Sequence, residues 1–258
     1  MVTEVIKVKY KEYDLGAVSY NTETQIGAFE YFPSFIKTGI ELSPLKMPLA
    51  KKIYSFPQID QLTFKGLPGL IADSLPDDFG NAVMNAWIAS LGKSTRDITP
   101  LQRLQYTGKR GMGALTYVPA TKRKNLNASQ PIHIESLISI AQEVLDRREQ
   151  FSVKLSHDGQ EKKQEMMSLL SVGMSAGGAR PKAVLAFNKD FSQVRSGQTD
   201  APNGFTHYLM KFDGVSEHNK NQETFGDPMG YGAMEYTYHL LAKECGIEMM
   251  PCYLLNEG

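Results

Sequence analysis

The chain opens with positions that alternate between apolar and polar residues, a pattern typical of half-buried strands. Residues 5–10 read VIKVKY, which places the apolar side chains on one face of the expected strand and the two lysines on the other. Two more strands are expected over residues 13–20 and 27–32, and the second runs into a proline and a serine that favour a turn. Three prolines exclude a long helix over residues 40–57 and favour short extended pieces there.

Helical spacing replaces this alternation after residue 80. Apolar residues recur three and four positions apart over residues 83–91, which predicts an amphipathic helix ended by a glycine. A second, short helix is expected to follow a cap residue, either Asp97 or Thr99. The glycine-rich segment 108–113 then leads into a strand over residues 114–118.

A polar stretch over residues 119–131 has the composition of a domain boundary. Amphipathic helices are expected behind it over residues 134–145 and, with a less regular pattern, over 161–170. We therefore expect an α+β fold in two parts. Residues 1–120 form an antiparallel sheet or small barrel with helices, and residues 128–258 form a second sheet with a helix packed on it.

The second part is expected to contain strands over residues 182–187, 205–212 and 251–255. Between the last two, apolar residues recur at helical spacing and predict a helix that ends at a glycine. These residues are Met234, Tyr238, Leu241 and Cys245, followed by Gly246.

Composition and charge exclude several classes of protein. The 258 residues carry 28 basic and 28 acidic side chains, so the net charge of zero argues against a protein that coats polyanions. Cys245 and Cys252 are too few for a disulfide scaffold and are expected to be buried thiols, and the five histidines lack metal-ligand spacing. The chain shows neither an apolar run of about 18 residues nor a signal-peptide pattern, so we expect no membrane segment and a cytoplasmic location.

The strongest chemical candidate is the glycine-rich segment over residues 171–182, SVGMSAGGARPK. Glycines allow backbone N–H groups to approach phosphate oxygens closely. The segment lacks the lysine of a Walker A motif and the preceding strand of a dinucleotide-binding motif or a nucleophile elbow. Its candidate nucleotide-binding residues are Ser175, Ala176, Gly177, Gly178, Ala179 and Lys182. The alternative is a glycine turn that only joins two structural elements.

A lysine and a glutamate follow this loop in the order that a protein-kinase N-lobe uses. Lys211 lies near the end of the strand expected over residues 205–212, and Glu235 lies at the start of the next helix. In that arrangement the lysine contacts the α- and β-phosphates and the glutamate holds the lysine, so we expect ammonium and carboxylate within about 4 Å. The alternative is an unrelated surface lysine and surface glutamate.

Residues 174–182, MSAGGARPK, closely resemble the nucleotide loop of HipA-like serine/threonine kinases, the toxins of HipBA toxin–antitoxin systems. Other stretches that resemble this family cover residues 67–81, 97–115, 208–212, 234–247 and 251–255. The resemblance thus extends over nearly the whole chain. It implies a HipA N-terminal subdomain for residues 1–120 and a kinase-like N-lobe for residues 128–258.

The resemblance also implies cofactors and partners. These are ATP and Mg²⁺, a HipB-like helix-turn-helix antitoxin, a protein substrate such as an aminoacyl-tRNA synthetase, and DNA only through the antitoxin. The family's C-lobe, with its catalytic base and magnesium ligands, has no counterpart in this sequence, so no catalytic or metal residue is assigned. We expect a truncated kinase that is inactive alone. The alternatives are a non-catalytic HipA-derived binding module and an α+β interaction protein that binds no nucleotide.

Members of the family phosphorylate a serine in their own nucleotide loop, which removes the loop from its ATP-binding position. The resemblance places this serine at Ser175, with Ser171 as the second candidate. A phosphate at this point would compete with ATP phosphates for the same donors.

Overall fold

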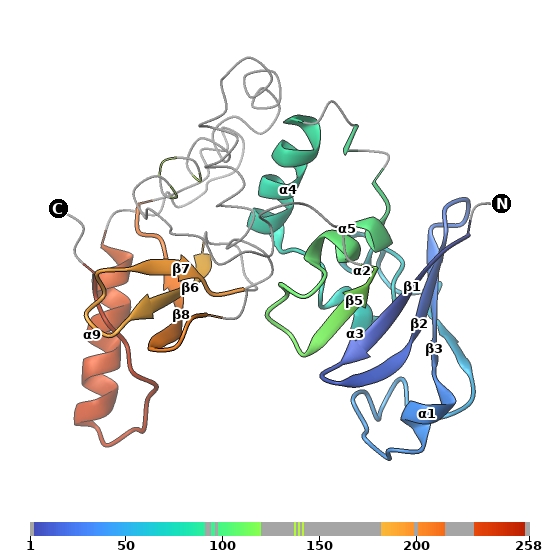
Figure 1. Ribbon diagram of the computed structural model, residues 1–258, viewed down its shortest axis with the longest axis horizontal. Coiled ribbons are helices and arrows are strands. Elements are labelled where there is room, and N and C mark those ends of the chain that lie inside the picture. Colours follow the sequence, from blue (N-terminus) through green and yellow to red (C-terminus); the bar gives the residue numbers. More distant parts are fainter. Residues whose placement is uncertain are drawn as a thin grey trace.

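The computed structural model describes residues 3–90, 94–95, 98–119, 137, 139, 141, 182–198, 201–214 and 230–255. All strand pairs in this part of the chain are antiparallel. They form two sheets, one from each half of the sequence (Figure 1). The expected mixed fold with antiparallel sheets is therefore confirmed. No helix among these residues is long and apolar enough to cross a membrane.

The first sheet has five strands in the order β4-β3-β2-β1-β5. The strands are β1 (Thr3–Tyr10), β2 (Tyr13–Asn21), β3 (Ile26–Tyr31), β4 (Ile53–Ser55) and β5 (Leu115–Val118). Because β4 and β5 lie at opposite edges, this sheet is open rather than closed into a barrel. Of the two arrangements expected for this part, the open sheet is the correct one.

One face of this sheet builds the first hydrophobic core. Ile6 and Val8 are 1% and 0% exposed, as their alternation with two lysines predicts. Short helices complete this half, and the last of them begins with a capping box between Thr99 and Gln102. Thr99 is thus the cap, while Asp97 lies outside the described residues. These helices are α1 (Pro33–Ile36), α2 (Gln61–Phe64), α3 (Gly69–Ala72) and α5 (Pro100–Thr107).

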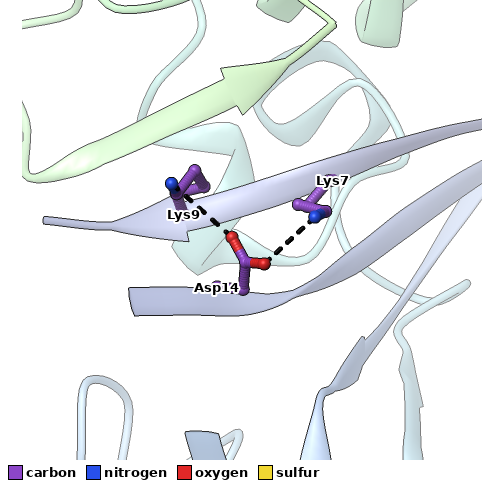
Figure 2. A network of polar contacts seen from close by, with 3 residues as sticks. All are labelled: Lys7, Lys9 and Asp14. Atoms are coloured by element: carbon purple, nitrogen blue, oxygen red, sulfur yellow. Dashed lines mark hydrogen bonds and ion pairs between the residues drawn. The ribbon is translucent and has the colours of Figure 1, made fainter. Parts of the chain in front are cut away.

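The outer face of the sheet carries charge instead. Figure 2 shows Asp14 of β2 between two lysines of β1, with Oδ2 3.0 Å from Lys7 Nζ and Oδ1 3.6 Å from Lys9 Nζ. The hydrogen bond that Lys7 donates lowers the pKa of Asp14. Exposed ion pairs of this kind add little to stability, so the apolar face is what determines the pairing of β1 with β2.

The longest helix of the first half, α4 (Asp78–Ser90), is held against α5 by a half-buried arginine. Arg103 donates hydrogen bonds from Nη1 to Asn81 Oδ1 at 3.1 Å and from Nη2 to Asn85 Oδ1 at 2.9 Å. Burial lowers the pKa of Arg103. The asparagines lie one turn apart on α4, so a single guanidinium fixes the contact between the two helices.

The second sheet has the order β7-β6-β8. Its elements are β6 (Lys182–Asn188), β7 (Val194–Ser196) and β8 (Phe205–Lys211), followed by α9 (Tyr231–Glu244) at its side (Figure 1). Ala183, Leu185 and Phe187 of β6 share one core with Val83 and Trp87 of α4. A helix from the first half of the sequence therefore packs with the sheet of the second half.

Some expectations for the second half are wrong. Cys245 and Cys252 are exposed, not buried, thiols. Residues 251–255 form no strand, although the ring of Tyr253 packs against those of Tyr208 and Phe191 at 5.9 and 5.3 Å. These side-chain contacts hold the segment beside the sheet without ladder hydrogen bonds.

Other expectations fall mainly outside the described residues. The polar boundary over 119–131 and the helix over 161–170 are among them. Of the helix expected over 134–145, Leu137 and Ala141 are helical, and both are buried in the second core.

Tyr31 makes the stability of the first core sensitive to alkaline pH. Its hydroxyl donates to the carbonyl of Met47 at 2.9 Å, and burial raises the pKa of Tyr31 from 10.0 to about 12. The unfolded chain loses the hydroxyl proton at a lower pH than the folded chain. The stability that the Tyr31 hydroxyl contributes is therefore complete below pH 10 and is lost as the pH rises towards 12.

We therefore expect the free energy of unfolding to fall less steeply above about pH 10 in Tyr31→Phe than in the unmodified chain. Urea titrations followed by circular dichroism at several pH values measure this slope. Tyr13→Phe replaces a tyrosine that is 37% exposed and should leave the slope unchanged. An unaltered slope in Tyr31→Phe would contradict the assignment.

Candidate functional site

The candidate site lies where β6 begins and β8 ends. Lys182, the first residue of β6, stands directly opposite Lys211, the last residue of β8. Residues opposite each other in an antiparallel pair project from the same face, so both lysines belong to one face of the sheet. The next pair on that face, Val184 and Leu209, is apolar. The face therefore combines a row of two cations with an adjacent apolar row.

Lys211 is held by Glu235. The distance from Nζ to Oε2 is 2.6 Å, and the two side chains are 49% and 45% exposed. The predicted contact between the two side chains is confirmed. A pair with this exposure contributes only about 0–1 kcal/mol to stability, so its main effect is to fix the position of the ammonium group.

Lys182 lies deeper than its neighbour, because it is only 7% exposed. Lys182 is also the last residue of the glycine-rich segment. Because Lys182 stands opposite Lys211, the end of that segment must lie close to Lys211. Ser171 and the loop residues Ser175, Ala176, Gly177, Gly178 and Ala179 lie outside the described residues. Their part in nucleotide binding and modification stays a prediction.

In the part of the chain that the structure describes, no group of three or more histidine, cysteine, aspartate or glutamate side chains is arranged to hold a metal ion. The charged side chains at the site are instead two lysines, one of which is paired with Glu235. Such a face fits an anionic ligand with a flat apolar portion better than a metal ion.

One contact beside the ion pair was missed by the sequence reasoning. The carboxylate of Asp213 accepts a hydrogen bond from the backbone N–H of Gly230 at 2.8 Å, and Gly230 is the N-cap residue of α9. No local motif signals this contact, because 17 positions separate the two residues.

Family models match both halves of the chain. The model of the HipA N-terminal domain matches residues 6–118, and that of the HipA-like C-terminal domain matches residues 174–258. The second match includes β6, β8 and α9, which carry Lys182, Lys211 and Glu235. Together the matches cover most of the sequence. The chain is a HipA-like protein.

A solved structure has the same fold as this HipA-like protein. It is the complex of HipA, HipB and operator DNA of a toxin–antitoxin system from Shewanella oneidensis MR-1, with a TM-score of 0.53 and 18% sequence identity. The match covers 98% of the chain and 48% of the solved one, so the HipA-like protein spans about half the length of this relative. Comparison with curated proteins finds no match.

Proposed function

We propose that this HipA-like chain is the N-terminal portion of a serine/threonine protein kinase toxin that uses Mg-ATP. The observation that carries the proposal is the 2.6 Å ion pair between Lys211 and Glu235. In a kinase N-lobe, a strand lysine binds the α- and β-phosphates and a helix glutamate holds that lysine. Here β8 and α9 supply the two residues in the same order, after a glycine-rich loop.

Each part of the face has a role in this proposal. Lys211 binds the phosphates, and Lys182 adds a second cation beside it. Backbone N–H groups of residues 175–179 donate to the phosphate oxygens. Val184 and Leu209, directly opposite each other in the neighbouring row, provide an apolar surface for the flat base.

The remaining catalytic parts are not assigned to residues of this chain, which spans 48% of the solved HipA complex chain that it matches. A kinase also needs a residue that orients the substrate hydroxyl and carboxylate or amide ligands for magnesium. We therefore expect these 258 residues to bind nucleotide weakly and to transfer no phosphate alone. A non-catalytic HipA-derived binding module is the second candidate.

Partners follow by analogy with the structural relative, which was solved with HipB and operator DNA. The proposal includes a HipB-like antitoxin that binds this protein. The antitoxin contacts the DNA, and this protein is connected to DNA only through the antitoxin. It also includes a protein substrate such as an aminoacyl-tRNA synthetase, phosphorylated by the longer kinase.

Nucleotide titration tests the site. We expect Mg-ATP to bind with a dissociation constant of roughly 1 mM, about −4 kcal/mol, and Lys211→Met to weaken binding by about tenfold or more. Chemical-shift changes in NMR spectra report binding in this range. Lys189→Met removes an exposed lysine from the turn after β6 and serves as the charge-matched control.

Equal affinity in Lys211→Met and Lys189→Met would exclude the proposed site. Incubation with radiolabelled ATP separates the two candidate functions. Phosphate transfer by the chain alone would show that it already contains the catalytic parts. Transfer only after the addition of a second polypeptide would support a split kinase over a binding module.

Modification of the loop gives a separate test. We expect the longer kinase to phosphorylate Ser175 and to lose ATP binding as a result, because the added phosphate carries about −1.5 to −2 charges. Mass spectrometry after incubation with ATP compares the unmodified protein with Ser175→Ala. An unchanged phosphopeptide yield would exclude Ser175, and transfer of the label to the other serine of the segment would identify Ser171.

A further inference from the structure

The helix that carries Glu235 depends on few contacts for its position. Among the 14 residues of α9, only His239 is buried. Its apolar residues Met234, Tyr238 and Leu241 are 52%, 67% and 55% exposed. Helices in proteins usually take their orientation from a packed apolar face. Because α9 has little such packing, contacts at its N-terminal end become more important for its position.

This N-terminal end has no local cap. Gly230 is the N-cap residue, with a φ of 114°, and it offers no side chain to the first N–H groups; the first turn contains no acidic residue. Asp213, in the bend that follows β8, supplies the missing carboxylate, because its Oδ2 accepts a hydrogen bond from the N–H of Gly230 at 2.8 Å. A carboxylate in this place also complements the positive end of the helix dipole.

The backbone that carries Asp213 is held in place by its buried neighbour in the sequence, Phe212. Phe212 is 7% exposed and lies in the core that the second sheet shares with α4. Its two neighbours in the sequence both reach α9: Lys211 contacts Glu235, and Asp213 contacts Gly230. Lys211 at the end of β8 and Asp213, two residues after it, therefore hold the first part of α9 at two points.

We infer that Asp213 is a positioning residue, which anchors the N-terminus of α9 and thereby keeps Glu235 within reach of Lys211. The anchoring rests on the contacts above, and only its consequence for nucleotide binding rests on the proposed function. In the proposed site Glu235 holds the Lys211 ammonium while it binds a phosphate. Asp213 then adds the second contact that keeps the helix, and with it Glu235, in place.

The position of α9 is measured first, without nucleotide. Spin labels are attached at Cys245, the C-cap residue of α9, and at Thr206→Cys on β8, in a background of Cys252→Ser. Pulsed electron resonance then gives the distribution of distances between helix and sheet. We expect a narrow distribution with Asp213 and with Asp213→Asn, whose amide oxygen still accepts the Gly230 N–H, and a broad one with Asp213→Ala.

Asp190→Ala is the matched control. It removes an exposed aspartate that accepts hydrogen bonds from Ser192 within the turn after β6. The distribution should stay narrow in this variant. A narrow distribution in Asp213→Ala, or equal broadening in Asp190→Ala, would overturn the inference. Because this measurement needs no ligand, it is decisive even if nucleotide binding itself is not found.

Nucleotide affinity then separates positioning from general loosening. We expect Asp213→Ala to weaken Mg-ATP binding by about three- to tenfold when Glu235 is present and to have almost no effect in Glu235→Gln. Such non-additivity is the signature of residues that act through each other. An equal loss in both backgrounds would show that Asp213 does not act through Glu235. Thermal unfolding of the variants confirms that each remains folded.

Discussion

Gly16→Val is expected to unfold the five-stranded sheet. Gly16 lies in β2, opposite Val8 of β1 and Tyr31 of β3. An ideal Cβ at this position would clash with the carbonyl oxygen of Glu30 and would lie 2.7 Å from Cζ of Phe29. Neighbouring strands on both sides prevent β2 from moving away without loss of ladder hydrogen bonds. We expect a loss of about 4 kcal/mol or more in the free energy of unfolding.

Urea unfolding followed by circular dichroism measures this loss, and Gly16→Ala provides a milder variant if valine prevents folding. Alanine already introduces the Cβ that meets the Glu30 oxygen, so it should also be clearly destabilising. The matched control is Gly113→Ala, where a Cβ meets nothing within 4 Å. We expect a change within about 0.5 kcal/mol for the control. Comparable stability of Gly16→Ala and Gly113→Ala would contradict the packing described for β2.

Phe29→Ala is expected to cost about 3–5 kcal/mol of unfolding free energy. Phe29 is 1% exposed, and its ring lies edge-on to that of Tyr31, with 4.9 Å between the centroids. It also stands opposite Val18 of β2 and Tyr54 of β4, so its removal leaves a cavity at the centre of the first core. The surrounding strands are hydrogen-bonded on both sides and collapse only partly into that space.

The control for this substitution is Ile53→Ala in β4, because Ile53 is 63% exposed. Its effect should stay within about 0.5 kcal/mol. A loss below about 1 kcal/mol in Phe29→Ala would mean that the ring does not fill the core. Positions 16 and 29 are also coupled, because a Cβ at position 16 would meet the Phe29 ring. Gly16→Ala should therefore be less harmful in a Phe29→Ala background, although its contact with the Glu30 oxygen persists.

The order of residues along the chain was enough to predict the ion pair between Lys211 and Glu235. The glycine-rich loop, Lys211 and Glu235 occur in the order of a kinase N-lobe, and the HipA resemblance agrees with that order. The 2.6 Å contact confirms their proximity. Order along the chain could not reveal the aspartate that anchors the helix, because Asp213 and Gly230 carry no motif and the contact depends on where β8 ends relative to α9.

The sequence by itself determined the local elements with strong periodicity. Alternation predicted β1 because one face of its sheet is packed and the other faces water, and β2 and β3 were also predicted as strands. Apolar spacing likewise predicted α4 and α9. The three-residue strand β7 was missed, since such a short segment does not display a period.

Only the tertiary structure decided which surfaces meet. The pattern in α4 shows an apolar stripe but not that this stripe shares a core with β6, which lies about a hundred residues further along the chain. The spacing of Met234, Tyr238 and Leu241 predicted a helix, yet these side chains are exposed and the polar Glu235 makes the contact with the sheet. Periodicity reports the backbone conformation of a segment. The face that becomes buried depends on partners that are distant in sequence.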